Sequence, residues 1–175
     1  MTLLAQLNYR YPRRNAMQRA AVRIASSRPG AWWLARLLPD VDGWVLALTR
    51  GRTSLVELVA GTPVISLTVR GSRTGIPRTR QLLGIPVNDT IAVIGTNFAQ
   101  GGNPDWVHNL LAEPRAVVSY RDSRLEVIAR EAAGSEYEQI FAAANLVFPG
   151  YGVYRSRLPH PPKVFVLEPH PATGS

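Results

Sequence analysis

The stretch from Arg70 to Arg78 combines glycine, hydroxyl and arginine residues in a pattern suited to binding an anion. Glycine lets the backbone turn its N–H groups toward a ligand, and Ser72 and Thr74 add hydroxyl donors. Arg73 and Arg78 add positive charge and forked hydrogen bonds. The spacing is not that of a P-loop, because the Gly-x-x-x-x-Gly-Lys pattern is absent. The stretch therefore predicts a phosphate or carboxylate site, with a plain basic hairpin turn as the alternative.

A glycine-rich polar loop between an expected strand and an expected helix forms a second candidate site, over residues 95–109. Such a loop exposes backbone donors and acceptors that could read the edge of a heterocycle. The helix is expected to begin at Asn103-Pro104-Asp105, with Asn103 as its cap. Trp106 and Asn109 lie three residues apart and therefore share a helix face. Either they line the site, or Trp106 belongs to the core and Asn109 ties down the loop.

Two tyrosines beside glycines mark a third segment, from Phe148 to Ser156. Tyr151 and Tyr154 could line a pocket, offering a flat surface and a hydroxyl donor. The alternative is that the two rings only close one end of a barrel. The segment on its own does not decide between the two.

The chain is strongly basic, with a net charge of +8 from 20 basic and 12 acidic residues. Lys163 is the only lysine, so the excess of arginine reflects either the base composition of the genome or an anionic partner. Candidate partners are a phosphorylated coenzyme, a membrane surface and nucleic acid. The basic residues are not interleaved with stacking aromatic residues in a recognisable motif, so no nucleic-acid partner is expected.

The residue types exclude several kinds of chemistry. Without Cys, the chain has no disulfide, no thiolate metal site and no Cys nucleophile. Its three His residues are scattered and form no ligand pattern, so no metal site is expected. No stretch of about 18 apolar residues could span a membrane. The first residues also lack the apolar core and cleavage site of a signal peptide. We therefore expect a cytoplasmic protein.

Residues 1–60 differ from the rest of the chain and are expected to form a helical N-terminal arm. Residues 15–26 have the pattern of an amphipathic helix with arginines on its polar face. Trp32, Trp33 and Trp44 follow it, and tryptophan favours the membrane interface. The arm is therefore expected to rest on an anionic membrane surface, which would place the protein on the inner face of the cell membrane. The alternative is that its apolar face packs on the barrel.

From Thr62 onward the apolar residues alternate with a period of two, as in half-buried strands. This second domain, residues 61–175, is expected to hold about six strands. Mostly antiparallel strands with few helices predict an α+β fold, a small β-barrel with peripheral helices. The expected strands are 64–69, 80–86, 91–95, 116–120, 125–131 and 164–167, with a hairpin turn at 87–90, and the expected helices are 103–112 and 135–146.

Together the three segments resemble the deazaflavin-dependent nitroreductase family, which are split β-barrel oxidoreductases that use coenzyme F420. The resemblance covers residues 60–169, and its motifs occur in the right order. The matching pieces are Gly71 to Arg78, Asn103 to Leu110, Glu113 to Arg115 and Phe148 to Tyr151, followed by Pro159 and Glu168-Pro169.

The resemblance implies a role for each matching position. Ser72, Arg73 and Thr74 would hold the coenzyme's phosphate and the start of its oligoglutamate tail. Further residues would border the coenzyme along the next strand, frame its deazaflavin ring, or face the acceptor. The bordering residues are Arg78, Thr79, Gln81 and Leu82; the framing residues are Ile94, Gly95, Thr96, Asn97, Trp106, His108 and Asn109; the acceptor-facing residues are Tyr154 and Tyr151, the expected catalytic pair.

The resemblance also implies a reaction. Reduced F420 would pass a hydride to a small organic acceptor (a quinone, an enone or a nitro compound), as in quinone reductases and nitroreductases. Because the coenzyme carries the hydride chemistry, the protein needs no nucleophile, and the sequence shows no obvious nucleophile, triad or metal site. Two alternatives stay open. One is a non-catalytic carrier of F420, a fatty acid or a tetrapyrrole on the same barrel, and the other is an FMN-binding reductase, since both cofactors present a phosphate.

Overall fold

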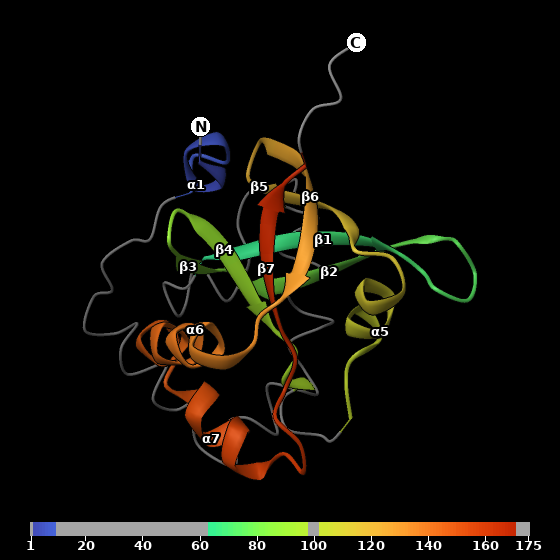
Figure 1. The fold of residues 1–175 in the computed structure, drawn as a ribbon. Coiled ribbons are helices and arrows are strands. Elements are labelled where there is room, and N and C mark those ends of the chain that lie inside the picture. Colours follow the sequence, from blue (N-terminus) through green and yellow to red (C-terminus); the bar gives the residue numbers. More distant parts are fainter. Residues whose placement is uncertain (1, 10–62, 98–101, 171–175) are drawn as a thin grey trace.

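The structure, a computed structural model, describes residues 2–9, 63–97 and 102–170, and Figure 1 shows how they are arranged. The helices, with the labels of Figure 1, are α1 (Leu3–Gln6), α5 (Asp105–Ala112), α6 (Gly134–Val147) and α7 (Gly150–Arg157). The strands are β1 (Val64–Arg70), β2 (Pro77–Leu83), β3 (Ile85–Val87), β4 (Thr90–Ile94), β5 (Arg115–Tyr120), β6 (Ser123–Glu131) and β7 (Val164–Pro169).

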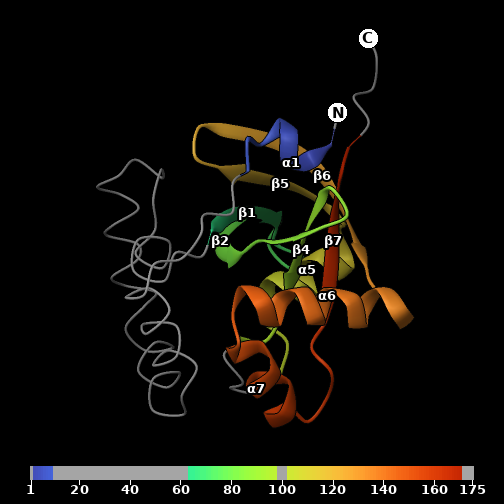
Figure 2. The same ribbon diagram turned by 90° about the vertical axis from the view of Figure 1, so that its left-hand side faces the viewer.

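The described strands form one antiparallel 7-stranded sheet in the order β2-β1-β5-β6-β7-β4-β3. The sheet curls into a split barrel with helices around it (Figures 1 and 2), which confirms the predicted α+β class. The sequence predicted about six strands. The additional strand arises because the stretch expected as a single strand, 80–86, divides in two. Residues 77–83 pair with β1, whereas residues 85–87 pair with β4.

Gly84 marks the point where the chain leaves one edge of the sheet for the other. A β-carbon at Gly84 would lie 2.8 Å from the Tyr9 hydroxyl oxygen and 3.2 Å from Ile65 Cγ2, so a larger residue would have to displace its neighbours. The Tyr9 hydroxyl also donates a hydrogen bond of 2.6 Å to the Gly84 carbonyl. β2 and β3 therefore stand at opposite ends of the strand order although a single residue separates them in the chain.

β7 lies between two groups of strands, β2-β1-β5-β6 on one side and β4-β3 on the other. It pairs with β6 on one side, where Leu167 faces Ala129, and with β4 on the other, where Phe165 faces Val93. The first four residues of β7 are all buried. Both faces of this strand are covered, which explains why its sequence is a continuous apolar run and does not alternate.

The inner core fills the barrel, and α1 and α5 contribute to it. Residues 2–9, the first described part of the expected N-terminal arm, thus pack into the barrel. The rest of that arm, including its amphipathic helix and three tryptophans, lies outside the described residues. Among the side chains of the inner core are Ile65, Leu67 and Val69 from β1, Trp106 and Leu110 from α5, and Leu3 and Leu7 from the N-terminal segment.

α6 and α7 lie on the outer side of the sheet (Figure 2), where α6 packs against β3 and a second core forms with β4 and β7. Two polar contacts hold α7 on α6. Arg155 pairs with Glu138 at 2.7 Å between Nη2 and Oε1, and its guanidinium lies 4.9 Å from the ring centroid of Phe141. The Gly152 N–H donates to Asn145 Oδ1 at 2.7 Å.

Three features of the helices differ from the prediction. The cap of α5 is Pro104 and not Asn103, and α6 begins one residue before its expected start, with Ala133 as its cap; neither helix has a side-chain capping bond. α7 was not expected, because its two glycines disfavour a helix. Its docking on α6 outweighs that weak local preference. No helix among the described residues is long and apolar enough to cross a membrane.

Candidate functional site

The turn between β1 and β2 is closed by its own hydrogen bonds. The Gly71 N–H donates to the Ile76 carbonyl at 3.0 Å, and the Gly75 N–H donates to the Gly71 carbonyl at 2.7 Å. The Ile76 N–H donates to Thr74 Oγ1 at 3.3 Å. Gly75 has a φ of +68°, which glycine adopts without strain. Residues 71–75 therefore form a turn of defined shape.

One further bond attaches this turn to α5. The Ser72 N–H donates to Asn109 Oδ1 at 2.9 Å, across 37 residues of sequence. The N–H groups of Arg73 and Thr74, by contrast, have no hydrogen-bond partner in the described part of the chain. Of the backbone donors expected to face an anion, these two at the tip of the turn are the ones left for a ligand.

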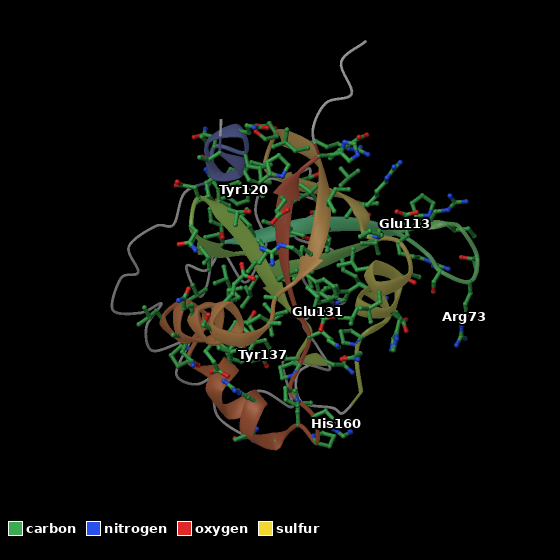
Figure 3. The ribbon with its side chains drawn as sticks, in the orientation of Figure 1. Arg73, Glu113, Tyr120, Glu131, Tyr137 and His160 are labelled. Atoms are coloured by element: carbon green, nitrogen blue, oxygen red, sulfur yellow. The ribbon has the colours of Figure 1, made fainter. Side chains whose placement is uncertain are left out.

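Four exposed arginines of the β1–β2 hairpin have no carboxylate partner among the described residues: Arg70, Arg73, Arg78 and Arg80, here called the hairpin arginines. Figure 3 shows Arg73 at the outer end of the hairpin, pointing away from the barrel. Arg70 folds back toward the turn, since its Nη2 would lie 3.4 Å from a β-carbon placed on Gly75.

The basic residues near α6, in contrast, form ion pairs with carboxylates. Arg130 Nη1 lies 2.8 Å from Glu136 Oε2, and Arg130 Nε lies 2.9 Å from Glu168 Oε1. The hydrogen bond from Arg130 holds the pKa of the Glu136 carboxyl below its usual range. Lys163 Nζ lies 2.6 Å from Glu131 Oε1. The hairpin is therefore a place where several positive charges gather without an ion pair to any carboxylate of the described residues.

The strand β2 presents its arginines on the face that continues into the inner core. Directly opposed residues of paired strands point to the same face of a sheet. Arg78, Arg80 and Leu82 stand opposite the buried β1 residues Val69, Leu67 and Ile65. This is also the face of β1 that carries the inner core together with α5.

The neighbouring residues of β2 point to the outer face and are bonded to β1. Thr79 Oγ1 lies 2.8 Å from Thr68 Oγ1, and the Ser66 hydroxyl donates to Gln81 Oε1 at 3.0 Å. The four residues expected to border the coenzyme thus lie on two opposite faces of β2. A ligand that lies flat on one face would contact one pair and not the other.

The two segments expected to frame a ring lie next to each other. A β-carbon on Gly95 would lie 2.6 Å from Val107 Cγ2 and 3.5 Å from Pro104 Cδ, so glycine allows the end of β4 to approach the start of α5. Thr96 is 8% exposed, and its hydroxyl has no hydrogen-bond partner among the residues that the structure describes. Asn97 has a φ of +45°, in the left-handed region. Residues 98–101 of the glycine-rich loop lie outside the described residues.

The side chains of α5 have three different surroundings: some pack in the inner core, some are exposed to solvent, and Asn109 contacts the β1–β2 turn. Trp106 is buried in the inner core, with its ring centroid 6.0 Å from that of Phe165 in an edge-on arrangement. His108 is exposed. Asn109 is 8% exposed and uses Oδ1 for the Ser72 N–H, which leaves its Nδ2 donors without a partner in the described residues.

Tyr151 and Tyr154, the expected acceptor-facing residues, belong to α7. Tyr151 is buried in the outer core, with its ring centroid 6.5 Å from Phe141 and 6.0 Å from Phe148, both edge-on. The side chain of Tyr154 lies outside what the structure describes. Figure 1 places α7 beyond α6 and apart from the β1–β2 hairpin, so the described residues do not bring Tyr151 to the turn.

The sequence profile of the F420H(2)-dependent quinone reductases matches residues 44–169. The chain belongs to this family. Among solved structures, the F420-H2 dependent reductase FDR-A is 27% identical, with a TM-score of 0.57 over 61% of this chain and 94% of that chain. A structure described as a domain-swapped dimer is 25% identical, with a TM-score of 0.59 over 72% of this chain and 98% of that one.

Membership of the quinone reductase family confirms the resemblance found in the sequence and the oxidoreductase class. The split-barrel arrangement is shared with the reductase FDR-A. The sequence did not single out Arg80 as a candidate. A signal for it was present, because Arg80 lies two residues from Arg78 in a strand and must share its face. Arg70 opens the predicted anion-binding stretch, but the sequence indicated no role for its side chain, since that side chain reaches the turn only by folding back toward Gly75.

Proposed function

We propose that this protein binds F420 and uses its reduced form to reduce a quinone. The observation that carries the proposal is the set of hairpin arginines, which have no carboxylate partner in the described residues. F420 is a polyanion with a phosphate and an oligoglutamate tail, so charge-assisted hydrogen bonds from guanidinium groups suit it. The N–H groups of Arg73 and Thr74 add two backbone donors at the same place.

Two buried polar groups fit the ring of such a coenzyme. The Thr96 hydroxyl and the Asn109 Nδ2 group belong to residues that are each 8% exposed, and both groups lack a partner among the described residues. A buried donor without a partner is costly, so acceptor atoms on a bound ring would stabilise this region. When bound, the coenzyme supplies the hydride. The role of the protein is to bind the coenzyme, orient it and keep water away from it.

Among the three acceptors expected from the sequence, we propose a quinone, because the family is described by quinone reduction. Hydride arrival leaves negative charge on the acceptor oxygen, and a hydroxyl donor aimed at that oxygen would stabilise it. We assign this role to Tyr154 from its place in the sequence. Tyr151 is a weaker candidate, because its ring is packed in the outer core. Nitro compounds and enones would develop the same charge and are the alternatives.

The test is a titration of the purified protein with F420 and, separately, with FMN, followed by adding menadione to the complex with reduced F420. The expected result is micromolar or tighter binding of F420, little binding of FMN, and oxidation of the coenzyme when menadione is added. A preference for FMN would contradict the coenzyme assignment. Tight F420 binding without turnover of menadione, an enone or a nitro compound would instead indicate a carrier.

A further inference from the structure

Among the described residues, Asn109 makes the one hydrogen bond that joins the turn between β1 and β2 to the rest of the protein. The other bonds of residues 71–76 run between members of the turn itself: Gly71 with Ile76, Gly75 with Gly71, and Ile76 with Thr74. These bonds give the turn its shape but do not orient it relative to the barrel. The bond from the Ser72 N–H to Asn109 Oδ1, at 2.9 Å, does.

The orientation of the Asn109 amide follows from its partner. A backbone N–H can only donate, so the group that faces Ser72 must be the carboxamide oxygen and not the nitrogen. Asn109 is 8% exposed and lies on the rigid helix α5, whose Trp106 and Leu110 are anchored in the inner core. The acceptor is therefore fixed in space before any ligand arrives, and it fixes Ser72 in turn.

Fixing Ser72 determines where the next two residues point. Arg73 and Thr74 follow directly, and their N–H groups have no partner in the described residues. A turn held only by its internal bonds could swing as a unit on the two strand ends. Ordering even one residue on ligand binding costs free energy equivalent to about a 5- to 30-fold loss of affinity.

We propose that Asn109 is a positioning residue: through Ser72 it holds the turn in the orientation that presents Arg73 and Thr74 to the anionic part of the ligand. The proposal rests on the proposed function in that the ligand is F420. It assigns to Asn109 an effect on the phosphate end of the coenzyme, in addition to a contact of its Nδ2 group with the ring. The same helix begins against Gly95, so α5 links the two ends of the site.

The experiment compares Asn109→Leu with Asn145→Leu in the full chain. Asn145, on α6, also accepts a hydrogen bond from a backbone N–H, that of Gly152 at 2.7 Å, and although it is more exposed than Asn109, its replacement controls for the loss of such a bond away from the hairpin. We expect Asn109→Leu to weaken F420 binding about tenfold, and Asn145→Leu to leave it unchanged. If Asn109→Leu fails to fold, as judged by its thermal melting, Asn109→Ala takes its place.

A double variant separates positioning from direct contact. Arg73→Ala should cost about tenfold in F420 affinity in the wild-type chain and less than about threefold in the Asn109→Leu chain, because a turn that is free to swing no longer aims Arg73. Equal costs in both chains would mean that Asn109 acts only through its own contact with the ring, and would overturn the proposal.

Amide hydrogen exchange gives a readout that needs no coenzyme. The Ser72 amide should exchange faster in Asn109→Leu than in the wild type, and Asn109→Asp, which keeps an acceptor oxygen, should restore its protection. Unchanged exchange in Asn109→Leu would refute the proposal whatever the coenzyme does. If the wild-type chain binds no F420 while Ser72 responds as expected, the proposed function is wrong and the anchoring of the turn by Asn109 stands.

Discussion

Replacing Arg73 by alanine should weaken F420 binding without weakening the fold. Arg73 lies at the tip of the hairpin, is exposed, and has no carboxylate partner among the described residues, so the folded protein loses no ion pair with it. A charge-assisted hydrogen bond to an anion is worth about 1.5–3 kcal/mol. Because the site is open to solvent, the lower end applies, and about 1.5 kcal/mol corresponds to about a tenfold increase in Kd.

Arg124 offers a matched control for net charge. It is also exposed, has no ion pair among the described residues, and each replacement removes one charge from the same net +8. Arg124 faces Ser119, which faces Ser66 on β1. Arg70 lies four residues further along β1, a rise of about 13 Å, and Arg73 lies beyond it. This exceeds the screening length of about 8 Å at physiological salt.

The assay is a fluorescence titration of F420 against wild type, Arg73→Ala and Arg124→Ala at physiological ionic strength, with thermal melting of each variant as a check on the fold. We expect the Kd to rise about tenfold for Arg73→Ala and to change less than twofold for Arg124→Ala. Similar losses for both variants would show that the overall charge of the protein, and not the local turn, attracts the coenzyme. The reasoning from unpaired arginines would then be refuted.

Three further outcomes are expected. Gly95→Ala should destabilise the fold by about 1–3 kcal/mol, because its β-carbon would lie 2.6 Å from Val107 Cγ2; Val107→Ala in the same chain should recover part of the lost melting temperature, and no recovery would contradict the packing argument. Tyr154→Phe should lower kcat with menadione about tenfold at unchanged F420 affinity; a wild-type rate would rule out the proton-donor role, and lost affinity would move Tyr154 to the coenzyme site. The full-length protein should float with liposomes of anionic lipid but not with neutral ones, and Trp32→Ser with Trp33→Ser should reduce that recovery; equal recovery in the soluble fraction would remove the membrane proposal.

Sequence periodicity was a reliable guide to the strands that have one buried face. In β1 the burial alternates residue by residue, as the alternation of Val64 to Val69 predicted. The hairpin turn expected at 87–90 is present, with Asn88 and Asp89 at φ values of +44° and +64°, which these residues tolerate better than most. Such features are local, so the sequence carries them directly.

Features that depend on a distant partner could not be predicted in the same way. The residues around Gly84 in the sequence do not indicate that Tyr9, 75 residues away, lies where a side chain at position 84 would be. They therefore do not predict that the strand divides there. The helix α7 is a similar case, because the hydrogen bond from the Gly152 N–H to Asn145 could not be predicted from the local sequence pattern. In both places tertiary contacts outweigh weak local preferences.

The candidate site was predicted in its residues more than in its arrangement. The sequence named the turn around Arg73 and the helix with Asn109, and the structure joins these two through Ser72. It did not reveal that Arg78 and Thr79 point to opposite faces of β2, although the alternation of a strand requires it once the strand is known. Nor could it tell a core Trp106 from a ring-framing one, since both occupy the same helix face.

The position of β7 bears on how the protein is made. During synthesis the chain emerges from its N-terminal end, so β1 to β6 are available before β7 exists. Until then the nascent chain holds two partial sheets, and the edge strands β6 and β4 are both unpaired on the side where β7 will later bind. Such unpaired edges are sites where chains can associate wrongly. A ribosome that stalls before residue 164 would therefore leave an open, aggregation-prone barrel, and a synthetic peptide of residues 159–170 supplied in trans is the natural means to close it.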